Sequence, residues 1–284
     1  MESLQASEIK AVPGLFVSDR FAARSISILK SHNITHVLSI TRPEDTPKYA
    51  PDQGITHCCI DIDDDPLADI LFHLQSACDW IQVALEEAED ENTSSEKGTE
   101  SSRTRPGVLV HCTQGISRSG ALCVAYLMRS LRLPYSEALS LARESRPLIT
   151  PNIGFEKQLR IWGFCEYEVV VPGSGSLTSA SGNVVTDVEK RPYVVWKKER
   201  DELFGKGEVA VNRERAKGLA GMAAEFGRRR REGRGKGGGD RKIGEGEKEG
   251  DKNGWERVEA MEKEWNRKMI NGEVGGESKE DASL

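Results

Sequence analysis

The chain has 284 residues, of which 37% are hydrophobic, and its 40 basic and 46 acidic residues leave a net charge of −6. It contains no run of 18 or more apolar residues, which excludes a membrane-spanning helix. Its first residues, Met1–Gln5, have neither the basic nor the apolar part of a secretory leader, so we expect none.

Short apolar runs alternate with helical patterns through the first 170 residues. The runs predict strands over 15–18, 34–40, 55–62 and 107–111, and the 3.6-residue periodicity predicts helices over 22–32, 67–87, 119–131, 135–145 and 152–166. This alternation predicts an α/β domain over residues 10–170.

Three further segments differ from this pattern in composition. Residues 86–106 are acidic and rich in Ser and Thr, which predicts a disordered insertion. Residues 171–191 are rich in Gly and Ser and are predicted to be a flexible linker. Residues 192–284 are predicted to be a charged tail of low-complexity and helical character, with a short anchoring segment over 192–204 that runs into a charged helix.

A basic tract rich in Gly, Arg and Lys covers residues 228–242. Such a composition cannot bury a core, and its plainest interpretation is a solvated tail. Nucleic acid or a nuclear import receptor are the partners that its charge suggests.

The loop His111–Gly120 carries the strongest chemical signal, because it lies between a predicted strand and a predicted helix. A loop in this place turns its backbone N–H groups inward, and the helix N-terminus adds partial positive charge, so it suits a phosphate dianion. The same field favours a nucleophilic thiolate at Cys112. Arg118 can fork onto two phosphate oxygens. We therefore predict phosphoryl transfer through Cys112, with the phosphate bound by Thr113, Gln114, Gly115, Ile116, Ser117 and Arg118.

Other interpretations of this loop fit less well. A nucleotide-binding P-loop needs Gly-Lys-Ser/Thr where this chain has Arg118-Ser119-Gly120. A zinc site needs further Cys or His at ligand spacing, which His111-Cys112 lacks. A buried structural cysteine would not explain the accompanying glycine, arginine and helix. We expect neither a metal nor a cofactor.

The pattern His-Cys-x-x-Gly-x-Ser-Arg-Ser at 111–119 resembles the signature of the dual-specificity protein phosphatases, within the cysteine-based protein tyrosine phosphatase superfamily. The resemblance extends over roughly residues 10–168, with further matches at 14–19, 34–40, 60–81 and 149–155. It implies a central mixed sheet flanked by helices, and hydrolysis of phosphotyrosine and phosphoserine or phosphothreonine in proteins through a phosphocysteine. It implies the atypical type, without a MAP-kinase-binding domain. The tail lacks the Cys residues that the zinc-binding domain of one subgroup needs.

A general acid is expected among four aspartates that follow a predicted strand, because expelling a serine, threonine or tyrosine oxygen requires a proton. The four are Asp61, Asp63, Asp64 and Asp65. When the chain is matched to the family without a gap, counting back from the helix end at Trp80-Ile81, the family's general acid falls on Asp64. Asp63 and Asp65 remain the alternatives.

The resemblance implies supporting roles for three more residues. Ser119 corresponds to a hydroxyl that hydrogen-bonds the cysteine sulfur in the second step. His111 corresponds to a residue that orders the loop, although a packed core histidine is an equal alternative. Asn152 corresponds to a residue that pins the loop, although a helix cap explains it too. Ser117 replaces the Asn of related RNA triphosphatases, which counts against a triphosphate substrate.

The substrate class follows from what the loop lacks. Residues 113–117 contain no Lys or Arg, whereas inositol-lipid phosphatases of the superfamily usually carry basic residues there. A phosphoprotein substrate is therefore favoured. The alternatives are an inactive phosphate-binding module, or a scaffold or nucleic-acid-associated protein that acts through its basic tail. Cysteine chemistry favours a reducing compartment, so we expect the cytoplasm or the nucleus; the sequence does not indicate an oligomeric state.

Overall fold

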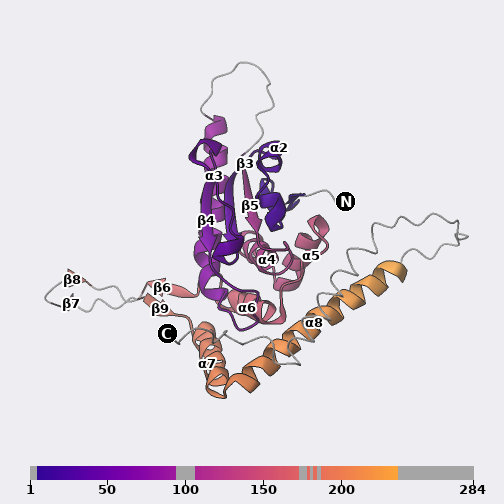
Figure 1. Cartoon of the computed structure of the whole chain (residues 1–284). Coiled ribbons are helices and arrows are strands. Elements are labelled where there is room, and N and C mark those ends of the chain that lie inside the picture. The colour runs from indigo at the N-terminus through magenta and orange to yellow at the C-terminus, as the bar shows by residue number, and fades with distance from the viewer. Residues whose placement is uncertain (1–4, 94–105, 173–177, 180–181, 184–186, 236–284) are drawn as a thin grey trace, which may run out of the picture. The chain divides into compact units, whose positions relative to one another are not determined.

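A five-stranded sheet forms the centre of the computed structural model, which describes residues 5–93, 106–172, 178–179, 182–183 and 187–235 (Figure 1). Its strand order is β1-β2-β5-β3-β4, with β1 antiparallel to β2 and every other neighbouring pair parallel, which confirms the mixed sheet. The strands are β1 (Ser7–Glu8), β2 (Leu15–Ser18), β3 (Ile34–Ile40), β4 (Thr56–Ile60) and β5 (Gly107–His111).

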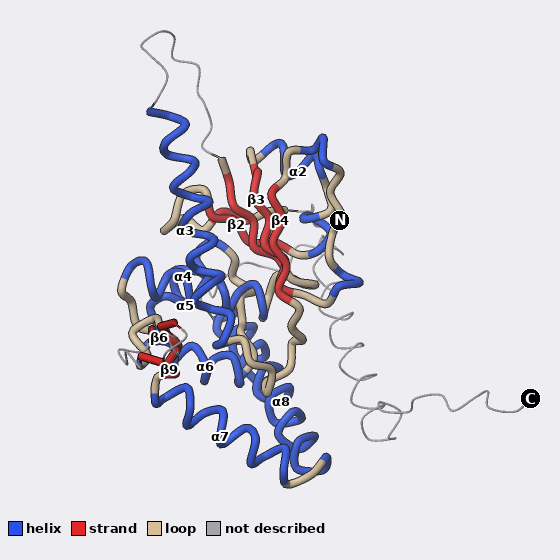
Figure 2. The backbone as a smooth tube through the Cα atoms, turned by 90° about the vertical axis from the view of Figure 1, so that its left-hand side faces the viewer, coloured by secondary structure: helices blue, strands red, loops and turns tan. Residues whose placement is uncertain are grey.

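Helices cover both faces of this sheet (Figure 2). Alternate residues of a strand point to opposite faces, so Leu38 and Val110 pack with the larger helical layer, and Val37 and Leu109 pack with the smaller one. The larger layer consists of α3 (Leu71–Thr93), α4 (Arg118–Leu131), α5 (Tyr135–Ser145) and α6 (Ile153–Phe164). The smaller layer consists of α1 (Arg20–Ala23) and α2 (Ile26–Ser31), and two 3₁₀ turns, Pro43–Asp45 and Pro51–Gln53, lie between β3 and β4.

Several predicted elements are confirmed with their bounds, namely the strands over 15–18, 34–40 and 107–111 and the helix over 135–145. The strand predicted over 55–62 is shorter, since β4 ends at Ile60. The helix predicted over 22–32 is two helices. Ser25 adopts an extended backbone conformation between them, and the carboxylate of Asp19 caps the first by accepting from the N–H groups of Phe21 and Ala22 at 2.9 Å.

Helix α3 differs from its prediction at both ends. It begins at Leu71 rather than 67, because the carboxylates of Asp65 and Asp69 accept the N–H groups of Leu67 and Phe72 and hold the preceding chain in turns. It ends at Thr93 rather than 87, so the first part of the predicted acidic insertion is helical. Residues 94–105 of that insertion lie outside the described residues, and its last residue, Pro106, is described.

The domain boundaries differ from prediction as well. Ala6 and Ile9 are buried in the core, so the domain begins before residue 10. The ends of the predicted linker 171–191 pair as antiparallel strands, β6 (Val170–Pro172) and β9 (Asp187–Glu189), because β-branched valines on both favour extended pairing. A second short pair, β7 (Thr178–Ser179) and β8 (Gly182–Asn183), lies between them.

The described part of the chain beyond the linker forms two helices that contact α6 (Figure 1). The predicted anchoring segment 192–204 is α7 (Arg191–Gly205), whose Tyr193 and Trp196 are buried. It is followed by α8 (Glu208–Gly235), and the described residues on both sides of position 170 belong to one compact unit, so no boundary between units lies there. The basic tract 228–242 is described only to the end of α8, and the predicted amphipathic piece 255–270 lies outside the described residues. None of the helices described has the length and hydropathy needed to cross a bilayer.

Candidate active site

The candidate site lies at the carboxyl edge of the parallel strands, where ligand sites of such sheets usually form. The loop after β5, residues 112–117, leads directly into the N-terminus of α4. Thr41 follows the neighbouring strand β3, and the segment 61–70, which we call the acid loop, follows β4. Three separate connections therefore meet around Cys112.

The conformation of the loop after β5 is held by hydrogen bonds from outside it. The carbonyl groups of residues 113–116 all accept from groups beyond the loop, so the N–H groups of residues 114–117 face inward, since the two ends of a trans peptide point in opposite directions. The four bonds run from Arg20 N to Thr113 (3.3 Å), from Arg146 to Gln114 (3.3 Å) and Gly115 (2.9 Å), and from Thr150 N to Ile116 (3.0 Å).

Gly115 is required at its place in this loop. Its φ is +70°, a conformation that L side chains rarely adopt, and a Cβ there would lie 2.5 Å from the carbonyl oxygen of Ser18. The backbone N–H of Gly115 lies 3.2 Å from the Cys112 sulfur and donates to it. The glycine therefore permits both the tight turn and a donor to the sulfur.

The Cys112 sulfur lies beside the N-terminus of a 14-residue helix, and the residue as a whole is 2% exposed. It accepts hydrogen bonds from the Ser119 hydroxyl and the Gly115 N–H, each at 3.2 Å. Two donors and the partial positive charge of the helix end all stabilise negative charge on sulfur. The arrangement supports a thiolate at Cys112 and a hydroxyl that still donates to sulfur when it leaves phosphorus.

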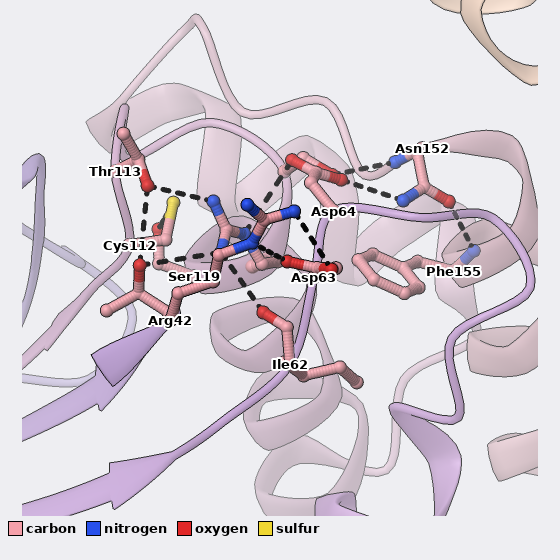
Figure 3. A network of polar contacts seen from close by, with 12 residues as sticks. Arg42, Ile62, Asp63, Asp64, Cys112, Thr113, Ser119, Asn152 and Phe155 are labelled. Atoms are coloured by element: carbon pink, nitrogen blue, oxygen red, sulfur yellow. Dashed lines mark hydrogen bonds and ion pairs between the residues drawn. The ribbon is translucent and has the colours of Figure 1, made fainter. Parts of the chain in front are cut away.

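Hydrogen bonds fix the Arg118 guanidinium, and two of the residues that accept them, Thr113 and Ile62, are labelled in Figure 3. The guanidinium donates to the hydroxyls of Thr41 (3.4 Å) and Thr113 (2.9 Å) and to the carbonyl of Ile62 (3.1 Å). Its Nε–H is buried and has no hydrogen-bond acceptor within the described part of the chain. Buried donors of this kind usually have a partner, and a phosphate oxygen would supply one.

Asp64 is the acid-loop residue that faces this site, as Figure 3 shows. Its carboxylate accepts from the Ser117 hydroxyl (2.6 Å) and from the Asn152 side-chain amide (2.8 Å), and its Oδ2 lies 3.9 Å from the Arg118 Nε. One third of the Asp64 side chain remains exposed. Asp64 is thus held next to Arg118 while part of its side chain stays accessible from solvent.

The neighbouring aspartates are engaged elsewhere. Asp63 pairs with Arg42, and this hydrogen bond, together with the positive charges of Arg42, Arg118 and Arg215, outweighs partial burial and holds the pKa of Asp63 below its ordinary value. Asp65 pairs with Arg215 on α8 at 2.7 Å. Both carboxylates therefore have cationic partners that hold them away from the loop after β5. The sequence of the four aspartates alone does not distinguish Asp64 from its neighbours in this way.

The side chains of Asn152 and His111 each make two hydrogen bonds. Asn152 accepts from the Phe155 N–H at 2.9 Å and so caps α6, and it also donates to Asp64. His111 is fully buried, hydrogen-bonds the Ser39 hydroxyl at 2.6 Å and lies 3.2 Å from the carbonyl oxygen of its neighbour Cys112. Burial lowers the pKa of His111 to about 4, so its ring is neutral near pH 7.

The structure brings together Cys112, Arg118, Ser119, Asp64 and Asn152, whereas Gln114 contributes only its backbone because its side chain is exposed. Sequence reasoning missed Thr41 and Arg146. Thr41 directly follows a parallel strand, a position that could have indicated it. Arg146 follows α5, far along the chain from the loop, and no local pattern marks it. No group of three or more His, Cys, Asp or Glu side chains suited to a metal ion occurs in the described segments.

Comparison with known proteins identifies relatives of the chain. The sequence model of the family "Dual specificity phosphatase, catalytic domain" matches residues 15–164. Dual specificity protein phosphatase 22 of Xenopus laevis is 32% identical over 157 residues, which are 55% of this chain and 65% of that protein, so the chain spans less than two thirds of this relative. Mouse dual specificity phosphatase 28 is 32% identical over 53% of this chain and 80% of its own length. The crystal structure of the human dual specificity phosphatase DUSP28 matches at 27% identity over 56% of this chain and 93% of its own, with a TM-score of 0.47.

Proposed function

The chain belongs to the dual-specificity phosphatase family, a family of cysteine-based protein phosphatases, and we propose that it hydrolyses phosphate esters of tyrosine, serine and threonine in proteins through a phosphocysteine at Cys112. The single observation that supports this most is the Cys112 sulfur itself. It receives two hydrogen bonds at a helix N-terminus, at the floor of a loop whose N–H groups face inward.

In the first step the Cys112 thiolate attacks phosphorus in line with the leaving oxygen, so a sulfur–phosphorus bond forms as the phosphorus–oxygen bond breaks. Arg118 and the inward N–H groups stabilise the charge on the equatorial oxygens. The proton that the leaving oxygen requires comes from Asp64, which Ser117 and Asn152 hold beside Arg118.

In the second step the now ionised Asp64 takes a proton from water as the water oxygen attacks phosphorus. The sulfur–phosphorus bond breaks, inorganic phosphate forms, and the thiolate is restored. Ser119 donates to the sulfur at 3.2 Å and stabilises the charge that returns to it. His111 remains neutral near pH 7 and acts through the loop backbone rather than on the proton.

The loop composition supports a phosphoprotein rather than an inositol lipid. Residues 113–117 carry no basic side chain that would meet the additional phosphates of such a lipid. A dephosphorylation assay on matched phosphotyrosine, phosphoserine and phosphothreonine peptides and on soluble inositol phosphates tests this directly. Preference for the inositol phosphates would contradict the proposed substrate class.

Three variants test the chemistry. Cys112→Ser and Arg118→Lys should each lower kcat by several orders of magnitude, because a hydroxyl is a poor nucleophile and an ammonium cannot fork onto two oxygens. Asp64→Asn should lower kcat by roughly 100-fold or more on a phosphopeptide, and much less on an aryl phosphate whose phenolate leaves unaided. Asp63→Asn and Asp65→Asn are the matched controls, which lack this strong selective loss. Near-normal turnover by Cys112→Ser would end the proposal, and a selective loss of roughly 100-fold in a control, with a much smaller loss in Asp64→Asn, would move the acid to that control's residue.

A further inference from the structure

The acid loop is held by helices that lie outside the matched family domain. That match ends at residue 164, whereas α7 and α8 begin at Arg191 and Glu208. Both helices nonetheless place side chains on the acid loop, on either side of Pro66. These contacts play no part in the chemistry described above.

The contact nearest the acid is an ion pair between α8 and Asp65. The Nε and a terminal nitrogen of Arg215 lie 2.8 and 2.7 Å from the same oxygen of Asp65. The other oxygen of Asp65 accepts the backbone N–H of Leu67 at 2.9 Å. Asp65 is largely buried, with 22% of its side chain exposed, and it directly follows Asp64. The pair therefore fixes the backbone one peptide from the acid.

Pro66, the next residue, lies between two glycines on different helices. A Cβ at Gly154 of α6 would lie 1.8 Å from the Pro66 carbonyl oxygen, and a Cβ at Gly218 of α8 would lie 2.6 Å from the Pro66 ring. Any side chain at Gly154 would thus displace the acid loop. Helix α8 therefore approaches the acid loop too closely for a side chain at Gly218, a position one turn from Arg215.

Helix α7 holds the far end of the same loop. The carboxylate of Asp69 accepts from the Tyr193 hydroxyl at 2.8 Å and from Arg200 at 3.2 Å. Arg200 also lies over the Trp196 ring, which is buried. The acid loop is therefore anchored at Asp65 by α8 and at Asp69 by α7.

We propose that Arg215 is a positioning residue for the general acid, and that α8 is in this way a working part of the catalytic unit. The inference rests on the proposed role of Asp64. Arg42 holds Asp63 on one side of the acid and Arg215 holds Asp65 on the other, so the two arginines together limit the movement of Asp64. Loss of Arg215 leaves the phosphate-binding loop intact but lowers the fraction of molecules in which Asp64 can protonate the leaving oxygen.

The test measures kcat for Arg215→Ala in the full chain on a phosphopeptide and on an activated aryl phosphate. We expect kcat to fall about three- to tenfold on the phosphopeptide and less than about twofold on the aryl phosphate, which needs no acid, with KM unchanged for both. Arg215→Lys should recover part of the loss. Lys217→Ala, which removes an exposed cation of the same helix paired with Glu214, is the matched control and should match the wild type on both substrates.

A double-mutant cycle separates positioning from general stability. In Asp64→Asn the acid is absent, so adding Arg215→Ala should cause no further loss on the phosphopeptide. Asp65→Asn weakens the same ion pair without shortening a side chain, and it replaces Arg215→Ala if that variant has a lowered melting temperature. Equal losses on both substrates, additive losses in the cycle, or no loss at all would overturn the role of Arg215. Absence of leaving-group dependence in Asp64→Asn would instead show that the acid assignment has failed, and this inference with it.

Discussion

Replacing Ser119 by Ala should separate the two chemical steps. The hydroxyl donates to the Cys112 sulfur at 3.2 Å and is fully buried, so no water replaces it when it is removed. A hydrogen bond to a charged group contributes about 1.5–3 kcal/mol, and 1.4 kcal/mol corresponds to a factor of about ten in rate. The sulfur has a second donor, the Gly115 N–H, which keeps the thiolate stabilised for attack.

The loss should therefore fall on breakdown of the phosphocysteine, in which sulfur leaves with its negative charge. We expect kcat to drop about 10- to 100-fold, and rapid mixing with an aryl phosphate should give a burst of phenolate close to one equivalent per site, because the first step remains fast. Ser130→Ala is the control, since this hydroxyl of the same helix donates to the Tyr126 carbonyl and is exposed. A similar fall in kcat without a burst in Ser119→Ala would refute the assignment of Ser119 to the second step alone.

Two further predictions concern the surroundings of the loop. Arg146→Ala should weaken inhibition by inorganic phosphate roughly tenfold in a competition assay, because the Gln114 and Gly115 carbonyls lose their partner and the loop N–H groups lose their orientation; unchanged inhibition would contradict this. Burial lowers the pKa of His111 to about 4, so the unfolded chain binds a proton that the folded chain does not as pH falls from about 6.5 to about 4. Urea unfolding should show that the free energy of unfolding falls by about 2 kcal/mol between pH 7 and pH 5, and that this fall is absent in His111→Asn. The same dependence of the unfolding free energy on pH in both proteins would refute the prediction.

The contiguous parts of the site could be predicted from the sequence. Cys112, Arg118 and Ser119 lie within eight residues, and a strand on one side and a helix on the other determine the loop geometry between them. The strands over 34–40 and 107–111 and the helix over 135–145 were predictable for the same reason, since each pattern is local. Short apolar runs indicate strands that are buried on both faces, and helical periodicity indicates a helix that is buried on one face.

The tertiary structure decided which aspartate faces the loop after β5. Asp63, Asp64 and Asp65 are chemically identical in the sequence, and what distinguishes them is the partner that each one meets: Arg42 for Asp63, and Arg215 for Asp65. Arg215 is 150 residues away from Asp65 along the chain, so no local pattern contains the pair. Such pairs form only when packing brings distant segments together.

The extent of the domain depended on packing in the same way. Residues 192–235 are charged enough to suggest a separate tail, and the sequence by itself determined only that part of them is helical. Burial of Tyr193, Trp196 and Val211 joins these helices to the rest of the compact unit. Three buried side chains among many charged ones are a weak signal in the sequence. In the fold, however, their removal from water holds α7 and α8 against the domain, and this places Tyr193 and Arg215 on the acid loop.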